Sequence, residues 1–313
     1  MTHSLVVGVD AGATSTRVAV HTLDGERVGY ARAGAGNPTA HGAEKAVANI
    51  AAALREALAS ADASAVAGSL AGIAGKQDIM DVELARLWAE HGIPKAPEMF
   101  GDVAIAYVAG SPAADGSLLL SGTGAIAARI SGYRQAVIAD GLGWLLGDAG
   151  SGFWIGRAAA KAVVQGLDRG EPAGELSELV LTHFLGAERG ATPRATADRI
   201  VRLAQADHMC LAALAALVSQ AASAGDPMAV KIAREAAGQL VATVRRLHTT
   251  GPVVLAGSVL TNPGPVRQAV RELLGDTPVR TARDAAGAAA WLAARDLLGS
   301  RAVELHERFV ATS

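Results

Sequence analysis

The sequence predicts an α/β protein built from two lobes, with a helical insert in the second lobe. Residues 5–20 read as an apolar strand, a turn of small residues and a second strand, and residues 117–130 repeat this pattern. Two such hairpins indicate two similar lobes, each contributing one loop to a shared cleft. Between residues 151 and 248 the apolar spacing is helical throughout, which predicts the insert.

Composition limits the classes of function. A chain of 313 residues with 50% hydrophobic content can form two cores and is not disordered. Its net charge of −2 gives no electrostatic reason to bind nucleic acid or an anionic membrane. The late apolar run at 211–218 is far shorter than the ~20 residues of a membrane span, and the first strand lacks a basic leader. The single Cys210 allows no internal disulfide, so we expect a cytoplasmic protein.

The first hairpin has the composition of a phosphate-binding loop. Gly12 can take a positive φ, and the short side chains of its neighbours, Thr14 and Ser15 among them, let backbone N–H groups converge on an anion. Asp10 lies where the first strand ends, a place that suits a metal-bound water. By itself this stretch also fits an ordinary hairpin that binds nothing.

The rest of the first lobe alternates strands and helices. Strands are predicted at 27–33, 65–74 and 97–101, and helices at 42–58 and 81–91. The loop at 34–39 contains Asn37, whose amide can donate to and accept from sugar hydroxyls or can simply form a turn before proline. Gly72, close to the end of its strand, would allow a ligand near the backbone or mark only a strand end.

Asp102 follows the strand at 97–101 and begins a short helix. Aspartate is a favoured N-cap residue, so this position has a purely structural explanation. It also suits a general base, because a carboxylate at the carboxyl edge of a sheet can take the proton of an attacking hydroxyl. We favour the general base, since the residue falls between the two glycine hairpins.

The second hairpin has its glycine turn at Gly122, Thr123 and Gly124, and a further strand at 135–139 leads into a glycine-rich segment. In this segment Asp148 either complements the start of the next helix or accepts from ligand hydroxyls. The helices of the insert are predicted at 155–167, 176–184, 195–206, 211–222 and 229–247. The insert is expected to shape the substrate side of the lobe or to form the surface of a homodimer.

The last part of the chain returns to the strand and turn pattern. A strand at 252–256 leads to Gly257 and Ser258, where the missing side chain of glycine leaves room for a flat nucleotide base. Residues 285–290 predict a helix with a small-residue face, suited to close contact at a hinge. We place the first lobe at 1–110 and the second at 111–296, with the insert at 151–250 and a final helix at about 297–313 that can pack back on the first lobe.

These motifs, in this order, resemble the acetate and sugar kinase, Hsc70 and actin superfamily, in particular its BadF/BadG-type branch, which includes N-acetylglucosamine kinases and actinobacterial glucosamine kinases. The resemblance covers nearly the whole chain, and its most specific part is Gly-Asp-Ala-Gly-Ser-Gly-Phe-Trp at 147–154. Ala149 departs from the glutamate usual in that loop. The resemblance implies an actin-like ATPase fold, also called ribonuclease H-like, and the use of ATP and Mg²⁺.

The resemblance also assigns roles to individual residues. It makes Asp102 the base for the 6-hydroxyl of a sugar, and it makes Asp10 the residue that orients the Mg²⁺ shell. The residues assigned to sugar binding are Asn37, Gly72, Asp102, Thr123 and Asp148. Those assigned to the nucleotide are Gly12, Thr14, Ser15, Gly122, Thr123, Gly124, Gly257 and Ser258. Phosphoryl transfer requires alignment and charge neutralisation more than covalent chemistry, and this set of residues offers both.

The prediction of the sugar rests on charge as well as on the resemblance. Glucosamine carries a largely cationic amine that needs a carboxylate or carbonyl partner, and the insert offers Glu175, Glu178 and Asp207. N-acetylglucosamine would need an apolar niche instead, and it remains the alternative substrate. A non-sugar ATPase of the BadF/BadG type is a lesser alternative, because a single cysteine per chain disfavours an iron–sulfur cluster. A non-catalytic binding module is the last alternative function.

Overall fold

The computed structural model describes residues 4–75 and 80–312, which divide into two compact units. Of the described residues, unit 1 comprises 4–75, 80–116, 130–136 and 280–312, and unit 2 comprises 117–129 and 137–279. The chain thus returns to unit 1 at 280, earlier than the 297 expected from the sequence. It does so because helix α13 (Ala285–Leu298) packs on strand β1 (Leu5–Ala11) of unit 1.

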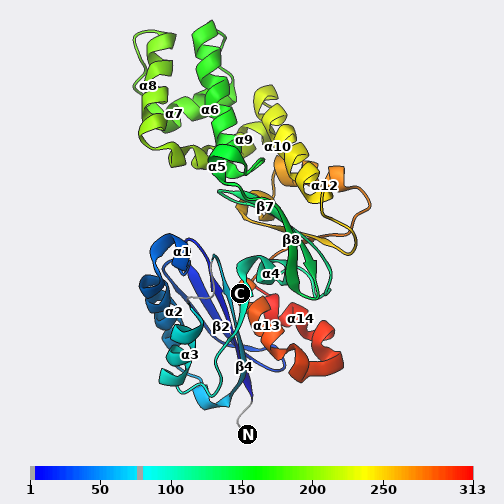
Figure 1. Ribbon diagram of the computed structural model, residues 1–313. Helices are drawn as coiled ribbons and strands as arrows, with labels where there is room; N and C mark the ends of the chain where they lie inside the picture. The colour runs from blue at the N-terminus through cyan, green and yellow to red at the C-terminus, as the bar shows by residue number, and fades with distance from the viewer. Residues whose placement is uncertain (1–3, 76–79, 313) are drawn as a thin grey trace. The chain divides into compact units, whose positions relative to one another are not determined.

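Unit 1 is a mixed sheet with helices on both faces. Its strands, in the order β3-β2-β1-β4-β5, are β3 (Arg27–Ala33), β2 (Thr16–Thr22), β1, β4 (Val66–Ile73) and β5 (Glu98–Gly101). Strands β1, β2 and β3 pair antiparallel, whereas β4 runs parallel to β1 and to β5. Figure 1 shows α1 (Pro38–His41), α2 (Ala43–Ala57) and α3 (Asp81–Glu90) on one side of this sheet and α4 (Asp102–Val108), α13 and α14 (Ala302–Val310) on the other. Short 3₁₀ turns lie at η1 (Ala63–Ala65) and η3 (Gly299–Arg301).

The small-residue face of α13 is used inside unit 1. A Cβ at Gly8 of β1 would run into the backbone of Ala286 and Ala290, so the absence of a side chain lets the helix lie directly on the strand. A Cβ at Gly287 would meet the carbonyl of Phe309 in α14 in the same way. This face therefore holds the last two helices against the sheet of unit 1, and the hinge role expected from the sequence is not needed to explain it.

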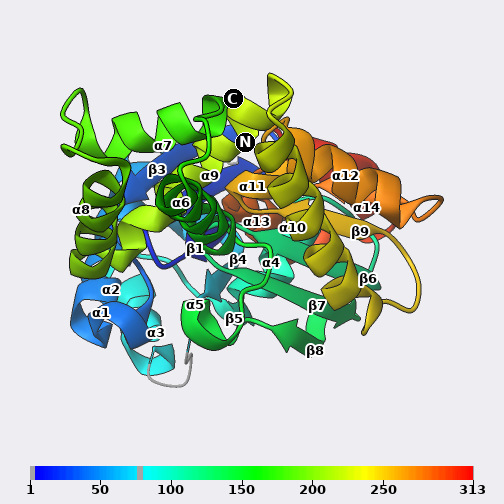
Figure 2. The same ribbon diagram turned by 90° about the horizontal axis from the view of Figure 1, so that it is seen from above.

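The second sheet, formed mostly by residues of unit 2, has the order β10-β9-β6-β7-β8. Its strands are β10 (Val279–Thr281), β9 (Val253–Ala256), β6 (Gly116–Ser121), β7 (Ala125–Ser131) and β8 (Arg134–Asp140). Strand β6 is parallel to β9, and Figure 2 shows β6, β7 and β8 running side by side. Helices α10 (Pro227–Arg245) and α12 (Pro265–Leu274) pack together beside it, and the apolar core joins them to the sheet.

The insert consists mainly of helices packed on α6 (Gly152–Arg169), namely α7 (Glu175–Leu185), α8 (Pro193–Ala206) and α9 (Leu214–Ser223). The single helix predicted at 211–222 is divided into a 3₁₀ turn, η2 (His208–Ala213), followed by α9. Gly156 of α6 lies against the carbonyl of Leu211, with no room for a Cβ. Among the described residues no single helix is long and apolar enough to cross a membrane, and one bent pair, 193–206 with 208–223, meets that test on length and composition alone.

Candidate active site

The first glycine turn connects β1 and β2 in unit 1. The amide of Gly12 donates to the carbonyl of Ser15 at 3.0 Å, and the amide of Gly36 donates to the carbonyl of Gly12 at 3.0 Å. Ala13 and Thr14, at the tip of the turn, are exposed, and their amides make no hydrogen bond within the described part of the chain. Exposed, unsatisfied amides in a tight turn are what a phosphate-binding loop requires.

Asp10 lies next to this turn, near the end of β1. Its carboxylate accepts from Arg17 Nη1 at 3.1 Å, and only 14% of the side chain is exposed. Burial raises the pKa of Asp10 to about 6, while the charge of Arg17 acts in the opposite direction and that of Asp102 adds to the rise. Asp10 is therefore a buried carboxylate whose ionised form would gain from a second positive charge.

The strand register brings Asp102 to the same edge of the sheet as Asp10. Ala11, Ile73 and Gly101 lie beside one another at the ends of β1, β4 and β5, and Asp102 follows directly. The N-cap of α4 is Gly101, so Asp102 is the first residue of the helix rather than its cap. Its Oδ1 accepts from the amide of Val103 at 2.9 Å, and burial raises the pKa of the carboxyl.

Two other predicted sugar-binding residues of unit 1 have structural roles as well. Asn37 caps α1, and its Oδ1 accepts from the amides of Thr39 and Ala40 at 2.9 and 3.2 Å. Because both bonds use the oxygen, the side-chain nitrogen of Asn37 stays available as a donor. At Gly72 a Cβ would collide with Ile105 of α4, so this glycine is required for helix packing whether or not a ligand approaches it.

The second glycine turn, in unit 2, is fastened to the start of α6. The amide of Gly152 donates to the carbonyl of Gly122 at 2.7 Å, and the amide of Gly122 donates to the carbonyl of Gly124 at 2.9 Å. The side chain of Ser151 caps α6 by accepting from the amide of Trp154 at 3.1 Å. The helix thus begins at Gly152, three residues before the 155 expected from the sequence, and it holds the turn in place.

Asp148 lies against this turn and is held by a residue that the sequence analysis did not single out. Its carboxylate accepts from the amide of Gly143 at 3.3 Å, and a Cβ at Gly124 would lie 2.8 Å from its Oδ2. Burial raises the pKa of Asp148, with a smaller rise from the charge of Asp140. The carboxylate of Asp140 accepts from the backbone amides of Asp148 and Ala149. An Asp-Gly pair at a strand end was the available signal for Asp140.

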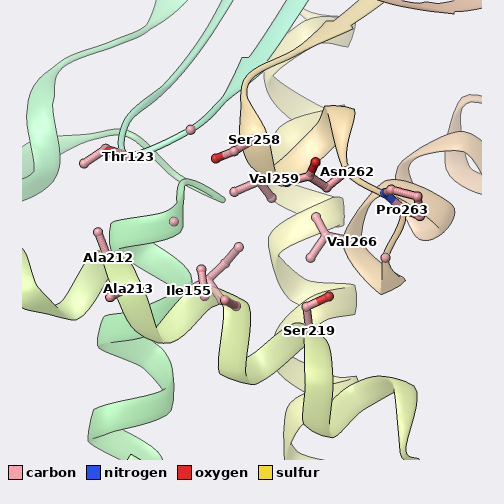
Figure 3. A pocket seen from close by; sticks show the side chains of 15 residues that line it. Thr123, Ile155, Ala212, Ala213, Ser219, Ser258, Val259, Asn262, Pro263 and Val266 are labelled. Atoms are coloured by element: carbon pink, nitrogen blue, oxygen red, sulfur yellow. The ribbon is translucent and has the colours of Figure 1, made fainter. Parts of the chain in front are cut away.

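A pocket of about 350 Å³ lies in unit 2 beside the second glycine turn. It is lined by Gly122, Thr123 and Ser258, which the family resemblance assigned to the nucleotide, and by further residues to which it gave no role. Figure 3 shows Ser258 and Asn262 on the side of α11 (Ser258–Thr261), Ile155 on α6 and Ser219 on α9. Apolar walls with a few polar groups are typical of a site for a small organic ligand.

Gly257, directly after β9, lies where there is no room for a side chain, and the sequence did not reveal this. Its φ is +79°, and a Cβ would run into the backbone of Ser121 and Gly122. The missing side chain therefore lets the turn after β9 lie on the end of β6. This contact places Ser258 at the pocket.

Two of the three carboxylates proposed to bind an amine have local partners. Glu178 pairs with Arg189 at 3.3 Å on the surface, and Asp207 caps η2 by accepting from the amide of Met209 at 3.1 Å. The ring of His208, the next residue, lies 4.4 Å from that of Trp144, which belongs to the same loop as Asp148. Of the three candidates, Asp207 is the one that adjoins this loop through a contact of its neighbour.

The described residues contain no group of three or more His, Cys, Asp or Glu side chains that could hold a metal ion by themselves. Asp10 and Asp102 are the carboxylates of the predicted site that lie at one edge of the sheet of unit 1.

Residues 7–294 match the BadF/BadG/BcrA/BcrD ATPase family. A glucosamine kinase of Vibrio cholerae is 24% identical over 274 residues, which are 81% of this chain and 84% of that protein. A solved structure from Chromobacterium violaceum, described as a candidate N-acetylglucosamine kinase, superposes with a TM-score of 0.71 at 24% identity over 93% of this chain and 99% of that one. One from Porphyromonas gingivalis with the same description gives 0.66 at 19% identity, over 88% and 93%. These likenesses confirm the predicted actin-like fold.

Proposed function

The chain belongs to the BadF/BadG/BcrA/BcrD ATPase family, and from this premise we propose that it is an ATP-dependent amino-sugar kinase. The reaction would transfer the γ-phosphate of ATP to the 6-hydroxyl of glucosamine. N-acetylglucosamine is the alternative acceptor. Support for an amino sugar comes from the relative in Vibrio cholerae, which is a glucosamine kinase, and from the two solved structures described as candidate N-acetylglucosamine kinases.

The observation that carries the proposal is the environment of Asp102. This carboxylate lies at the carboxyl edge of a sheet whose first turn presents free backbone amides, and burial raises its pKa. A raised pKa makes the carboxylate a stronger base for the proton of a sugar hydroxyl. The bond from the amide of Val103 fixes one oxygen, Oδ1, and leaves Oδ2 for that proton.

The nucleotide would be held by backbone groups and by the pocket of unit 2. We assign the phosphates to the turns around Gly12 and Gly122 and the adenosine to the pocket that includes Ser258. Mg²⁺ fits this scheme, because it is usually bound by one or two carboxylates plus phosphates and water, and buried Asp10 would be stabilised by its charge. When bound, the ion would supply neutralisation of the phosphate charge.

For the sugar we propose contacts from the donor nitrogen of Asn37, the carboxylate of Asp148 and the second glycine turn at Thr123. We propose that Asp207 binds the amine of glucosamine, because the ring of the next residue, His208, lies against that of Trp144 in the loop of Asp148. A carboxylate at this place favours an amine over an acetamide, because a cationic group needs a charged or strongly polar partner. Glu178 is less suited, since Arg189 already pairs with it.

A panel of hexoses in a coupled assay of ADP release tests the proposal. We expect the highest kcat/KM with glucosamine, a lower value with glucose and the lowest with N-acetylglucosamine. Higher turnover with N-acetylglucosamine would reject glucosamine and leave the kinase assignment intact. ATP hydrolysis that no hexose stimulates would reject the kinase in favour of a non-sugar ATPase of the same family.

The variant Asp207→Asn tests whether Asp207 binds the amine of glucosamine. Loss of the charge should reduce kcat/KM for glucosamine much more than for glucose, because glucose has no amine to pair. Glu178→Gln is the matched control, since it removes a carboxylate from the same insert that already has a partner in Arg189. Equal losses of kcat/KM for glucosamine and glucose would exclude Asp207 as the residue that binds the amine.

A further inference from the structure

Asp140 ends β8 and closes the loop that leads to Asp148. Its Oδ1 accepts from the amide of Asp148 at 2.8 Å, and its Oδ2 accepts from the amide of Ala149 at 2.9 Å. One carboxylate thus binds two consecutive backbone amides, each at a distance typical of a strong, charge-assisted hydrogen bond. This pair of bonds fixes the two peptide planes that flank Cα of Asp148, the atom from which its side chain projects.

The backbone on both sides of this clamp is in an uncommon conformation. Asp140 has φ of +64° and Asp148 has φ of +54°, a region that residues other than glycine seldom adopt. At Gly147 a Cβ would run into Oδ1 of Asp140 and Cβ of Leu142, so this position leaves the carboxylate room to reach the amides. Surrounding contacts must maintain the conformation of Asp148, and the two bonds from Asp140 supply such contacts.

The loop is closed a second time by Asp148 itself. Its Oδ1 accepts from the amide of Gly143, and its Oδ2 lies beside Gly124 of the second glycine turn. The carboxylate of Asp148 is therefore oriented at both ends: Asp140 holds its backbone, and Gly143 holds one of its oxygens. The other oxygen faces the turn that the proposed function assigns to ligand binding.

We propose that Asp140 is a positioning residue for sugar binding, which acts by holding the Asp148 carboxylate in its binding orientation. This inference rests on the proposed function, in which Asp148 accepts from sugar hydroxyls. Asp140 need not touch the sugar itself. Loss of the clamp would let the loop rotate about Asp148, and a displacement of this kind affects sugar affinity before it affects the chemical step.

The test variant is Asp140→Gly, because glycine adopts a positive φ without strain and so removes the clamp while permitting the same backbone path. We expect KM for the sugar to rise about 10- to 100-fold, the range for loss of a supporting residue, with KM for ATP nearly unchanged. A variant that only lost stability would lower the active fraction and kcat, leaving KM for the sugar as it was. Unchanged KM for the sugar would overturn the proposal.

The control variant is Asp115→Gly, in a carboxylate of unit 1 that also accepts two loop bonds, from Ser131 Oγ at 2.9 Å and from the amide of Gly132 at 3.2 Å. It should leave KM for the sugar unchanged. A second route is the double variant Asp140→Gly with Asp148→Ala. If Asp140 acts through Asp148, the double variant should match Asp148→Ala alone, whereas additive effects would refute that path.

Hydrogen exchange supplies a readout that does not depend on activity. The amides of Asp148 and Ala149 should be protected in the wild type and should exchange at least about tenfold faster in Asp140→Gly. Should Asp140→Gly fail to fold, Asp140→Asn keeps one acceptor, and an intermediate rise in KM for the sugar is expected. Unchanged exchange in the variant would refute the clamp. A wild type that phosphorylates no sugar, with the exchange result as expected, would refute the proposed function and leave the clamp intact.

Discussion

Replacement of Asp102 by asparagine separates its catalytic role from its structural one. Asparagine keeps an oxygen that can accept from the amide of Val103 at the place of Oδ1, so the first turn of α4 is retained. Loss of the negative charge at the helix start costs less than about 1 kcal/mol, and relief of the buried charge acts in the opposite direction. The free energy of unfolding should therefore change little.

The turnover of Asp102→Asn should fall far more than its free energy of unfolding. A removed general base costs about 10²- to 10⁴-fold in rate, which corresponds to about 3 to 5 kcal/mol of lost transition-state stabilisation. A large loss of kcat with nearly unchanged unfolding is the signature of a base. Similar losses of kcat and of the free energy of unfolding would indicate that Asp102 has only a structural role.

The assay is coupled ADP release with glucosamine as acceptor, alongside urea unfolding of the same preparations. In the wild type, kcat/KM should fall as the pH drops through the raised pKa of Asp102, because only the ionised carboxylate accepts the proton. The control is Asp62→Asn, which alters an exposed aspartate that caps η1. Wild-type turnover in Asp102→Asn would refute the role as base.

Three other variants test the site. Burial raises the pKa of Asp10 from 3.8 to about 6. Ionisation of Asp10 therefore lowers the stability of the native state by up to about 3 kcal/mol as the pH rises through this window. The variant Asp10→Asn should resist urea better than the wild type at pH 7.5 but not below pH 4. Gly257→Ala should lower the free energy of unfolding in urea by about 2 to 4 kcal/mol, because the position has a positive φ and a Cβ would clash with backbone atoms. The control Gly238→Ala, in open space within α10, should raise the free energy of unfolding by up to about 1 kcal/mol. Ala216→Trp should fill the pocket of unit 2 and abolish ATP binding in calorimetry without lowering the melting temperature.

The local pattern of the sequence determined the elements around the site. Alternation of apolar strands with glycine turns predicted both hairpins, and the structure has β1, β2, β6 and β7 at those places. Helical spacing predicted α6 at 155–167, because an amphipathic face is visible in the local sequence. The structure begins the helix earlier, at Gly152, with Ser151 as its N-cap. The motif order was also enough for the family, which the match over residues 7–294 confirms.

Tertiary structure decided what each of these residues contacts. Gly72 makes room for Ile105, and Gly257 makes room for the backbone of Ser121; a sequence shows that a glycine is present but not which distant atom occupies the space of its missing side chain. The pKa of Asp10 likewise depends on burial and on the charge of Asp102, 92 positions later in the chain. Asp140 lies close to Asp148 in the chain, yet a glycine-rich loop allows many paths, and only the folded backbone turns both amides toward its carboxylate.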